Sequence, residues 1–305
     1  MRESALLEHI RERSAPLRGR GAVVVGPGDD CAVLALPGLT LATVDHLVEG
    51  RHYDPSLPVD LIARKAVARS VSDIAAMGGE PSCGLATGCL RDGFEHADEL
   101  FDRMAHWANE FGCPLAGGDI AFSPGPTVLT VTVLGRPHHL RGPVERSTAN
   151  EGDKVCVTGA LGNSLASGRH AAFEPRIREA RELCTTLGHA LTSMIDISDG
   201  LGRDAGRVAA ASGVRIEIDS WRVPLAPGTR SWRSACADGE DYELLFTVKG
   251  DAELPRDTVA GTPVTVIGRV VRGAGCIARD EEGTVYPIGD MGWDHGAGPH
   301  DEGGA

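Results

Sequence analysis

Six aspartates recur beside glycines or at the ends of apolar segments, and their oxygens could hold a hard metal ion. They are Asp30, Asp45, Asp73, Asp119, Asp196 and Asp199. Such a set favours Mg²⁺ over Zn²⁺, and Mg²⁺ is usually shared between a few carboxylates and phosphate groups. Glycines at positions 26, 28, 117 and 118 would let the backbone approach phosphate oxygens closely. The pattern predicts phosphate transfer or cleavage by positioning and charge neutralisation.

The segment 194–200 predicts a buried strand that leads directly into a helix. Ile195 and Ile197 are β-branched and suit a strand. Ser198 is a suitable N-cap, Asp199 in the first turn suits the helix dipole, and Gly213 supplies a stop. Two carboxylates and a hydroxyl would then lie where the strand meets the helix, where open α/β sheets bind ligands. The alternative is a capped helix with one stray aspartate.

Asp73 interrupts the small, apolar second half of a helix predicted over 58–78. Burying a carboxylate without a partner costs several kcal/mol, so we expect Asp73 to have a cation or hydrogen-bond donors. The alternative is an aspartate that faces solvent.

The other elements follow from hydrophobic periodicity. Helices are predicted at 3–13, 95–111 and 175–191, and strands at 23–25, 31–34, 39–45, 83–90, 128–134, 154–158, 214–218, 244–248 and 263–271, with a hairpin at 276–286. A further strand at 114–119 is expected to end in a glycine turn. The polar segment 138–152 is the predicted linker between domains at 1–137 and 153–295, and the tail 296–305 is expected to be disordered.

Composition excludes several classes of protein. The formal net charge of −13 over 305 residues argues against non-specific binding to nucleic acid. The eight cysteines form no CxxC pair, so we expect reduced cysteines in a cytoplasmic protein without a leader peptide. No apolar run approaches the ~20 residues of a membrane span.

The sequence also carries a family resemblance that covers roughly residues 20–295. The segments 28–33, 45–52, 72–78, 117–119, 195–201 and 239–244 resemble, in this order, the motifs of the thiamine-monophosphate kinase family. The resemblance implies the two-domain α/β (α+β) fold of aminoimidazole-ribonucleotide synthetase. In that fold the N-terminal domain binds ATP and Mg²⁺ and forms a homodimer through its sheet. The implied reaction transfers phosphate in line from ATP to thiamine monophosphate, giving thiamine diphosphate.

The resemblance also implies roles for individual residues. Several Mg²⁺ ions would be bound by Asp30, Thr43, the backbone of Val44, Asp45, Asp73, Asp119, Asp196 and Asp199, of which Asp30, Asp73, Asp119 and Asp199 would be catalytic. ATP would contact Phe101, Gly118, Asp119, Arg146 and Ser198, with Phe101 near the adenine. Thiamine monophosphate would contact His52, Glu240 and Trp293. Trp293 offers a flat face to the cationic thiazolium, and Glu240 offers a compensating charge.

The chain departs from the family pattern in three places. Val44 replaces a threonine, Asp238 replaces a glycine, and the region 167–175 is shorter than usual. These departures concern the acceptor more than the metal or ATP. One alternative is therefore another ATP-dependent kinase or ligase of the superfamily with a different small-molecule substrate. A second is a regulatory protein that binds nucleotide or metal without catalysis, which needs fewer carboxylates than this chain offers.

Overall fold

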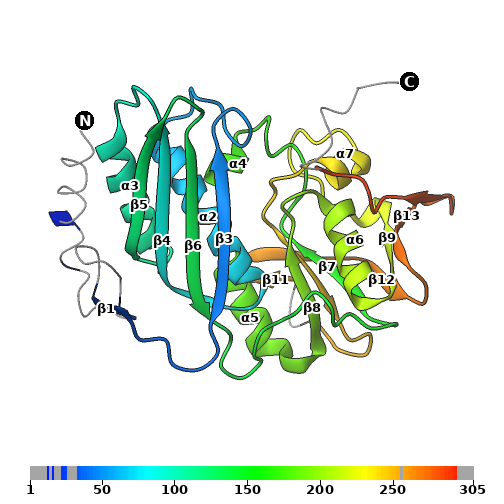
Figure 1. The fold of residues 1–305 in the computed structure, drawn as a ribbon. Coiled ribbons are helices and arrows are strands. Elements are labelled where there is room, and N and C mark those ends of the chain that lie inside the picture. Colours follow the sequence, from blue (N-terminus) through cyan, green and yellow to red (C-terminus); the bar gives the residue numbers. More distant parts are fainter. Residues whose placement is uncertain (1–11, 14–15, 17–21, 26–32, 255–256, 294–305) are drawn as a thin grey trace. The chain divides into compact units, whose positions relative to one another are not determined.

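The computed structural model describes residues 12–13, 16, 22–25, 33–254 and 257–293 (Figure 1). The chain divides into two compact units. The N-terminal unit comprises residues 1–144 and 170–189, and the C-terminal unit comprises 145–169 and 190–305. The segment 170–189 thus packs with the N-terminal unit, although the residues before and after it, 145–169 and 190–305, belong to the C-terminal unit. The domain boundaries at 137 and 153 stay a prediction.

A four-stranded mixed sheet forms the framework of the N-terminal unit. Its strands lie in the order β3 (Leu41–Val48), β6 (Val128–Arg136), β4 (Glu80–Arg91), β5 (Leu115–Ser123). Only β4 and β5 are parallel. Helix α2 (Val59–Ala76) packs against β3 and β6, and α3 (Ala97–Glu110) packs against β5 and α2. Figure 1 shows both helices on one face of the sheet.

The register of β3 and β6 separates the covered face of this sheet from its open face. Leu47 pairs with Leu129, and Asp45 pairs with Val131, so these side chains share the face toward α2. The alternate positions on β3 point the other way, and Val44 among them is 59% exposed. The predicted strand 128–134 is an inner strand of the sheet, because β6 lies between β3 and β4.

Smaller elements complete the N-terminal unit. Strands β1 (Val23–Val25) and β2 (Val33–Leu34) form an antiparallel pair. The short helix α4 (Arg169–Ala172) enters the unit, and α5 (Ile177–Leu187) packs on α2. The predicted helix 175–191 ends early because Gly188, at φ 51°, ends α5, and a 3₁₀ turn (Gly188–Ala190) follows. The predicted helix 3–13 lies almost wholly outside the described residues.

A second mixed sheet of eight strands forms the C-terminal unit. Its order is β14 (Val285–Pro287), β13 (Gly275–Arg279), β9 (Arg215–Asp219), β12 (Thr262–Val271), β7 (Lys154–Thr158), β10 (Leu244–Val248), β8 (Leu191–Asp196), with β11 (Thr258–Val259) beside β12. Only β13 and β9 are parallel. Helix α6 (Leu201–Ser212) packs on β8, β9 and β13, and α7 (Trp232–Ala237) packs on α6. A 3₁₀ turn (Ser220–Arg222) follows β9.

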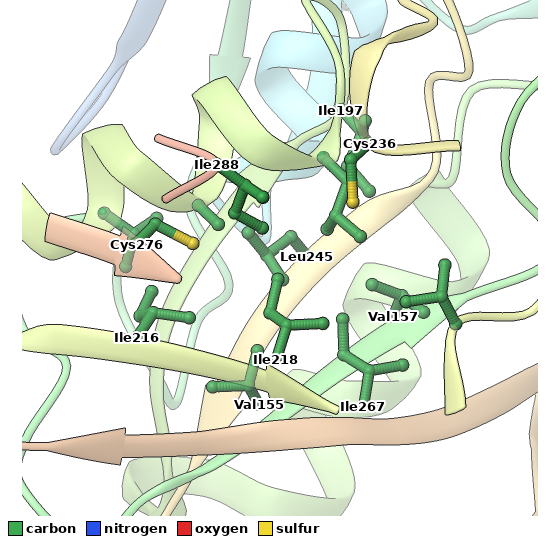
Figure 2. Packing of buried hydrophobic residues seen from close by; sticks show 14 of the residues in the cluster. Val155, Val157, Ile197, Ile216, Ile218, Cys236, Leu245, Ile267, Cys276 and Ile288 are labelled. Atoms are coloured by element: carbon green, nitrogen blue, oxygen red, sulfur yellow. The ribbon is translucent and has the colours of Figure 1, made fainter. Parts of the chain in front are cut away.

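The core of the C-terminal unit explains why these strands form. Val155 and Val157 alternate along β7, Ile216 and Ile218 alternate along β9, and Leu245 lies on β10, where it pairs with Val157. Figure 2 shows these side chains converging with Ile267 and Ile288. Branched apolar side chains at every second position bury one face of a strand and stabilise the sheet against unfolding. The hairpin predicted at 276–286 is confirmed by the antiparallel pairing of β13 with β14.

No helix within the described residues is long and apolar enough to cross a membrane. The seven described cysteines are free, and all but Cys89 are buried.

Candidate active site

The predicted metal ligands of the N-terminal unit meet in part where β3 lies against α2. Thr43 Oγ1 on the strand donates a short hydrogen bond to the carboxylate of Asp73 on the helix. Ser70 Oγ, one turn earlier on α2, donates to Asp45 Oδ2 at 3.1 Å. Arg69 Nη2 lies 3.9 Å from Asp45 Oδ1. Asp73 is thus partly buried and has a hydroxyl donor, which confirms the partner expected from its place in the helix.

Asp119 lies on the other edge of the same sheet and on its other face. Asp119 on β5 pairs with Thr87 on β4. Thr87 in turn pairs with Thr130 on β6, and Thr130 pairs with His46 on β3. Paired residues point to the same side of a sheet, so these four side chains share the open face. His46 Nδ1 lies 2.8 Å from Thr130 Oγ1, in agreement with that register. Three strand spacings, about 14 Å in total, separate β5 from β3. Asp119 and Asp45 therefore cannot ligate one ion within a single sheet.

Gly118 has a steric role that the sequence did not reveal. A Cβ on this residue would lie 1.8 Å from the carbonyl oxygen of Ala86 on β4. The predicted glycine turn at 117–119 is therefore wrong, because β5 continues through these residues to Ser123. Glycine is required there because the neighbouring strand approaches so closely.

Three further predicted residues of the N-terminal unit lie apart from this corner. Asp30 lies outside the described residues. Val44 points to the open face, as described above. Phe101 lies in the first half of α3 and is partly exposed.

His52 lies in the turn that follows β3. The Val48 amide donates to His52 Nδ1 at 2.8 Å, and the His52 carbonyl accepts from Lys65 Nζ at 2.6 Å. The imidazole is therefore fixed in orientation by its own turn.

In the C-terminal unit, Asp196 ends β8 and Asp199 follows it, and both are buried. The guanidinium of Arg207 bridges two carboxylates: Nη2 donates to Asp199 Oδ2 and Nη1 donates to Asp204 Oδ1 at 2.6 Å. Asp204 Oδ2 also accepts from the Asp199 amide at 3.0 Å. Burial raises the pKa of Asp204 to about 6, and the charge of Arg207 opposes that rise.

The helix that follows does not begin as predicted. Gly200, at φ 116°, is the N-cap of α6, and the helix starts at Leu201. Ser198 is therefore not the N-cap, and Asp199 precedes the first turn, where the acidic residue is Asp204. A Cβ on Gly200 would lie 2.8 Å from the carbonyl oxygen of Cys236, so tertiary packing selects glycine for this position.

A loop at 238–243 brings Glu240 to the Ser198 turn. Its amide donates to the Ser198 carbonyl at 2.7 Å, and its carbonyl accepts from Ser164 Oγ at 2.6 Å. Glu240 and Tyr242 both have positive φ, at 65° and 52°. Left-handed conformations are uncommon for such side chains and persist only where surrounding contacts impose them.

Those contacts come from the segment 159–169. The buried carboxylate of Asp241 accepts from the Gly162 amide through both oxygens at 3.0 Å and from Arg169 Nη2 at 2.5 Å. Burial raises the pKa of Asp241 to about 7, against the charge of Arg169. Asp238 Oδ2 accepts from the Asn163 amide at 2.9 Å, which gives this departure from the family pattern a structural role.

Trp293 and Arg146 lie at different ends of α6. The Trp293 amide donates to the Asp199 carbonyl at 2.8 Å, and its side chain is 49% exposed. The Arg146 carbonyl instead accepts from Ser212 Oγ at 3.0 Å, at the last residue of α6. The helix separates its two ends by about 16 Å. Ser198, Asp199, Glu240 and Trp293 are thus brought together, whereas the backbone of Arg146 is not.

The oxygen ligands at the β3–α2 corner and at the Asp196–Asp199 turn suit Mg²⁺. Neither group of side chains alone supplies enough ligands for a metal ion. Thr43, Asp45 and Asp73 offer a hydroxyl and carboxylates, which are hard oxygen ligands. Within the described part of the chain, no three histidine, cysteine, aspartate or glutamate side chains come close enough together to hold a metal ion. A bound ion would need ligands beyond these, such as phosphate oxygens or water.

Two family models define the class of protein to which this architecture belongs. Residues 28–136 match the N-terminal domain of AIR synthase related proteins, and residues 150–281 match the C-terminal domain of the same proteins. The strand–helix corner lies within the first of these domains, and the Asp196–Asp199 turn lies within the second.

Similar proteins narrow the class to one family. The chain is 34% identical to the thiamine-monophosphate kinase of Rhodopirellula baltica, covering 94% of this chain and 96% of that protein. It is 33% identical to that of Escherichia coli K12, covering 91% and 93%. The chain belongs to the thiamine-monophosphate kinase family.

Solved structures agree with this assignment. The thiamine-monophosphate kinase of Stenotrophomonas maltophilia K279a superposes with a TM-score of 0.73 at 28% identity, covering 91% of this chain and 96% of that one. A structure described as "AaThiL complexed with AMPPCP and TMP" superposes with a TM-score of 0.72 at 27% identity, covering 97% and 99%.

Proposed function

We propose that this chain transfers the γ-phosphoryl group of ATP directly to thiamine monophosphate, with in-line displacement of ADP, to form thiamine diphosphate. The observation that carries the proposal is the corner of β3 and α2, where hydroxyl groups of Thr43 and Ser70 orient the carboxylates of Asp73 and Asp45. Oriented carboxylates without a Walker lysine suit transfer between phosphates that are held through metal ions. Full-length similarity to thiamine-monophosphate kinases supports the identity of the acceptor.

Mg²⁺ is the proposed cofactor. Asp45, Asp73 and the Thr43 hydroxyl would hold it in the N-terminal unit, and Asp196 and Asp199 would hold it in the C-terminal unit. Asp30, Asp119 and the Val44 backbone complete the proposed ligand set, which would hold several ions. When bound, the ion reduces the repulsion between the γ-phosphate and the acceptor phosphate, which is severe in a dry site. The protein's own contribution is to hold both phosphates in line and to exclude water.

The acceptor and nucleotide contacts are proposals on the same basis. Glu240 and Trp293 lie beside the Ser198–Asp199 turn and would bind the cationic ring of thiamine monophosphate. His52 would bind its phosphate. ATP would contact Phe101 and Gly118, together with Asp119, Ser198 and the side chain of Arg146.

We also propose a homodimer formed through the N-terminal sheet. Among the described strands of this sheet, β3 and β5 each pair on one side only, so their outer edges carry backbone groups that another strand could pair with. Pairing β3 of one copy with β5 of the other would close the two sheets into a barrel and remove these edges. Asp119 of the partner subunit would then lie one strand spacing from β3, on the open face that Val44 and His46 share. Light scattering at micromolar concentration should give the mass of a dimer, and a monomer would contradict this proposal.

The catalytic proposal is tested by measuring ADP release with thiamine monophosphate, thiamine and an aminoimidazole ribonucleotide precursor as separate acceptors. We expect turnover only with thiamine monophosphate and only with Mg²⁺. Asp45→Asn should lower kcat, whereas Trp293→Ala should raise the KM for thiamine monophosphate with little change in the KM for ATP. Asp92→Asn, an exposed aspartate of the N-terminal unit, is the matched control. Full activity in EDTA, or preference for another acceptor, would overturn the proposal.

A cytoplasmic location and the lack of a nucleic-acid partner also belong to the proposal. The free cysteines support the first, and the net charge of −13 supports the second.

A further inference from the structure

Lys65 is a buried lysine whose position the proposed reaction does not yet explain. Its side chain is 0% exposed in the middle of α2. Nζ donates to the carbonyl oxygen of His52 at 2.6 Å and contacts Nδ1 of His170 at 2.9 Å. Lysine is almost never fully buried unless it is paired, because its charge loses hydration. A lysine retained at this position indicates that its contacts matter.

The first contact fixes the turn that carries His52. The His52 amide donates to the Val48 carbonyl at 2.9 Å, and the Val48 amide donates to His52 Nδ1 at 2.8 Å. Because Nδ1 accepts a hydrogen bond, the proton of the neutral imidazole lies on Nε2. The Lys65 ammonium holds the carbonyl of the same residue, so both the backbone and the tautomer of His52 are defined. The ring therefore carries its proton on Nε2, and an N–H donor is the kind of group that a phosphate oxygen accepts from.

The second contact anchors Lys65 to a segment distant in sequence. His170 Nδ1 accepts from the ammonium, so the His170 ring is neutral and carries its proton on Nε2. Burial, together with the charge of Lys65, lowers the pKa of His170 to about 4, in agreement with that state. His170 belongs to the shortened region 167–175, which therefore supports the His52 turn through Lys65.

We propose that Lys65, anchored by His170, is a positioning residue that holds His52 as an Nε2–H donor for the phosphate of the acceptor. The inference rests on the proposed function, because it is that function which assigns the acceptor phosphate to His52. Lys65 acts through the His52 carbonyl and needs no contact with substrate.

The test replaces Lys65 by methionine, which keeps the length of the side chain and removes the ammonium. Loss of a hydrogen bond from a charged group predicts a rise of about tenfold or more in the KM for thiamine monophosphate. The KM for ATP and kcat should change less than about twofold, since the metal ligands are untouched. Nitrogen NMR of the histidine rings should show the Nε2–H tautomer of His52 in the unaltered protein and a mixture of tautomers in Lys65→Met.

Arg64→Met is the matched control. Arg64 is the preceding residue of α2, is also buried, and also donates to the 170–174 segment, at the Phe173 carbonyl and Glu174. Its guanidinium contacts that segment and the rings of Trp107 and Phe111 rather than the His52 turn, so its loss should leave the His52 tautomer and the acceptor KM unchanged. If Lys65→Met does not fold, His170→Ala removes the anchor alone and should produce the same changes at smaller size.

The outcomes separate this inference from the function on which it rests. If a folded Lys65→Met variant keeps both the acceptor KM and the His52 tautomer, the positioning role is overturned. If Arg64→Met produces the same changes, the effect is one of general packing and the inference is also overturned. If the unaltered protein does not phosphorylate thiamine monophosphate, the proposed function fails, and the NMR comparison still decides whether Lys65 positions His52.

Discussion

His170 should make the N-terminal unit sensitive to acid, and the sign of the effect follows from its environment. Burial and the neighbouring Lys65 lower its pKa from 6.5 to about 4 in the folded protein. Between these values the unfolded chain binds a proton that the folded chain does not bind. Protons then favour unfolding, so the stabilisation is fully present above pH 6.5 and is lost as the pH falls toward 4.

The size of the effect follows from the gap between the two pKa values. Each pKa unit corresponds to about 1.4 kcal/mol, so the whole gap gives at most about 3 kcal/mol, of which about 2 kcal/mol is lost by pH 5. The ring is only partly buried, and water screens part of the interaction with Lys65. We therefore expect His170 to contribute about 1–2 kcal/mol to the difference in unfolding free energy between pH 7.5 and pH 5.

Urea unfolding followed by circular dichroism at these two pH values measures the contribution. His170→Asn cannot titrate and offers an amide oxygen to Lys65, so its unfolding free energy should fall less on acidification than that of the unaltered protein. His189→Asn, at an exposed position in the same unit, should lose as much as the unaltered protein. An equal loss in His170→Asn and the unaltered protein would refute the reasoning.

Two further predictions concern packing and charge. Gly118→Ala should lower the melting temperature strongly or prevent folding, because its Cβ would collide with the Ala86 carbonyl. Gly88→Ala is the control and should be tolerated, because the nearest atom to its Cβ lies at 3.6 Å. Arg207→Met leaves the buried carboxylate of Asp204 without its cation and should cost about 1–3 kcal/mol of unfolding free energy at pH 8, discounted because Arg207 is partly exposed. That cost should shrink at pH 5, since Asp204 has a pKa of about 6 and is protonated at pH 5. An equal cost at pH 8 and pH 5 would contradict an ion pair between Arg207 and Asp204.

The secondary structure could be predicted where local pattern decides it. Helices α2 and α3 and strands β7 and β10 were predicted to within two residues, because periodicity and length distinguish them. The failures lie where a distant neighbour decides. Gly117 and Gly118 have the composition of a turn, yet both pair with β4 as strand residues, and Ala86 approaches Gly118 closely. Nothing in the local sequence reports that approach.

The chemistry of the site was more predictable than its geometry. The aspartates could be identified by type, but the hydroxyl that orients Asp73 lies thirty residues earlier, on a different element. The Arg169–Asp241 pair joins residues 72 positions apart, so neither was singled out. Ser198 satisfies every local rule for an N-cap, but packing against Cys236 places glycine at the cap. Propensity indicates what a residue can do, and tertiary contacts select among those roles.

The placement of Asp119 separates it from Asp45 and Asp73, both in one copy and in the proposed dimer. The sequence order treats Asp45, Asp73 and Asp119 as one ligand set, whereas the register of the sheet assigns the first to the covered face of one edge strand and the last to the open face of the other. In the proposed dimer the edges β3 and β5 of two copies meet, and paired strands keep their covered faces on one side and their open faces on the other. The partner's Asp119 would therefore lie beside Val44 and His46, while Asp45 and Asp73 stay on the side of α2. The two groups of carboxylates would then bind separate ions, as a proposed set of several Mg²⁺ ions requires.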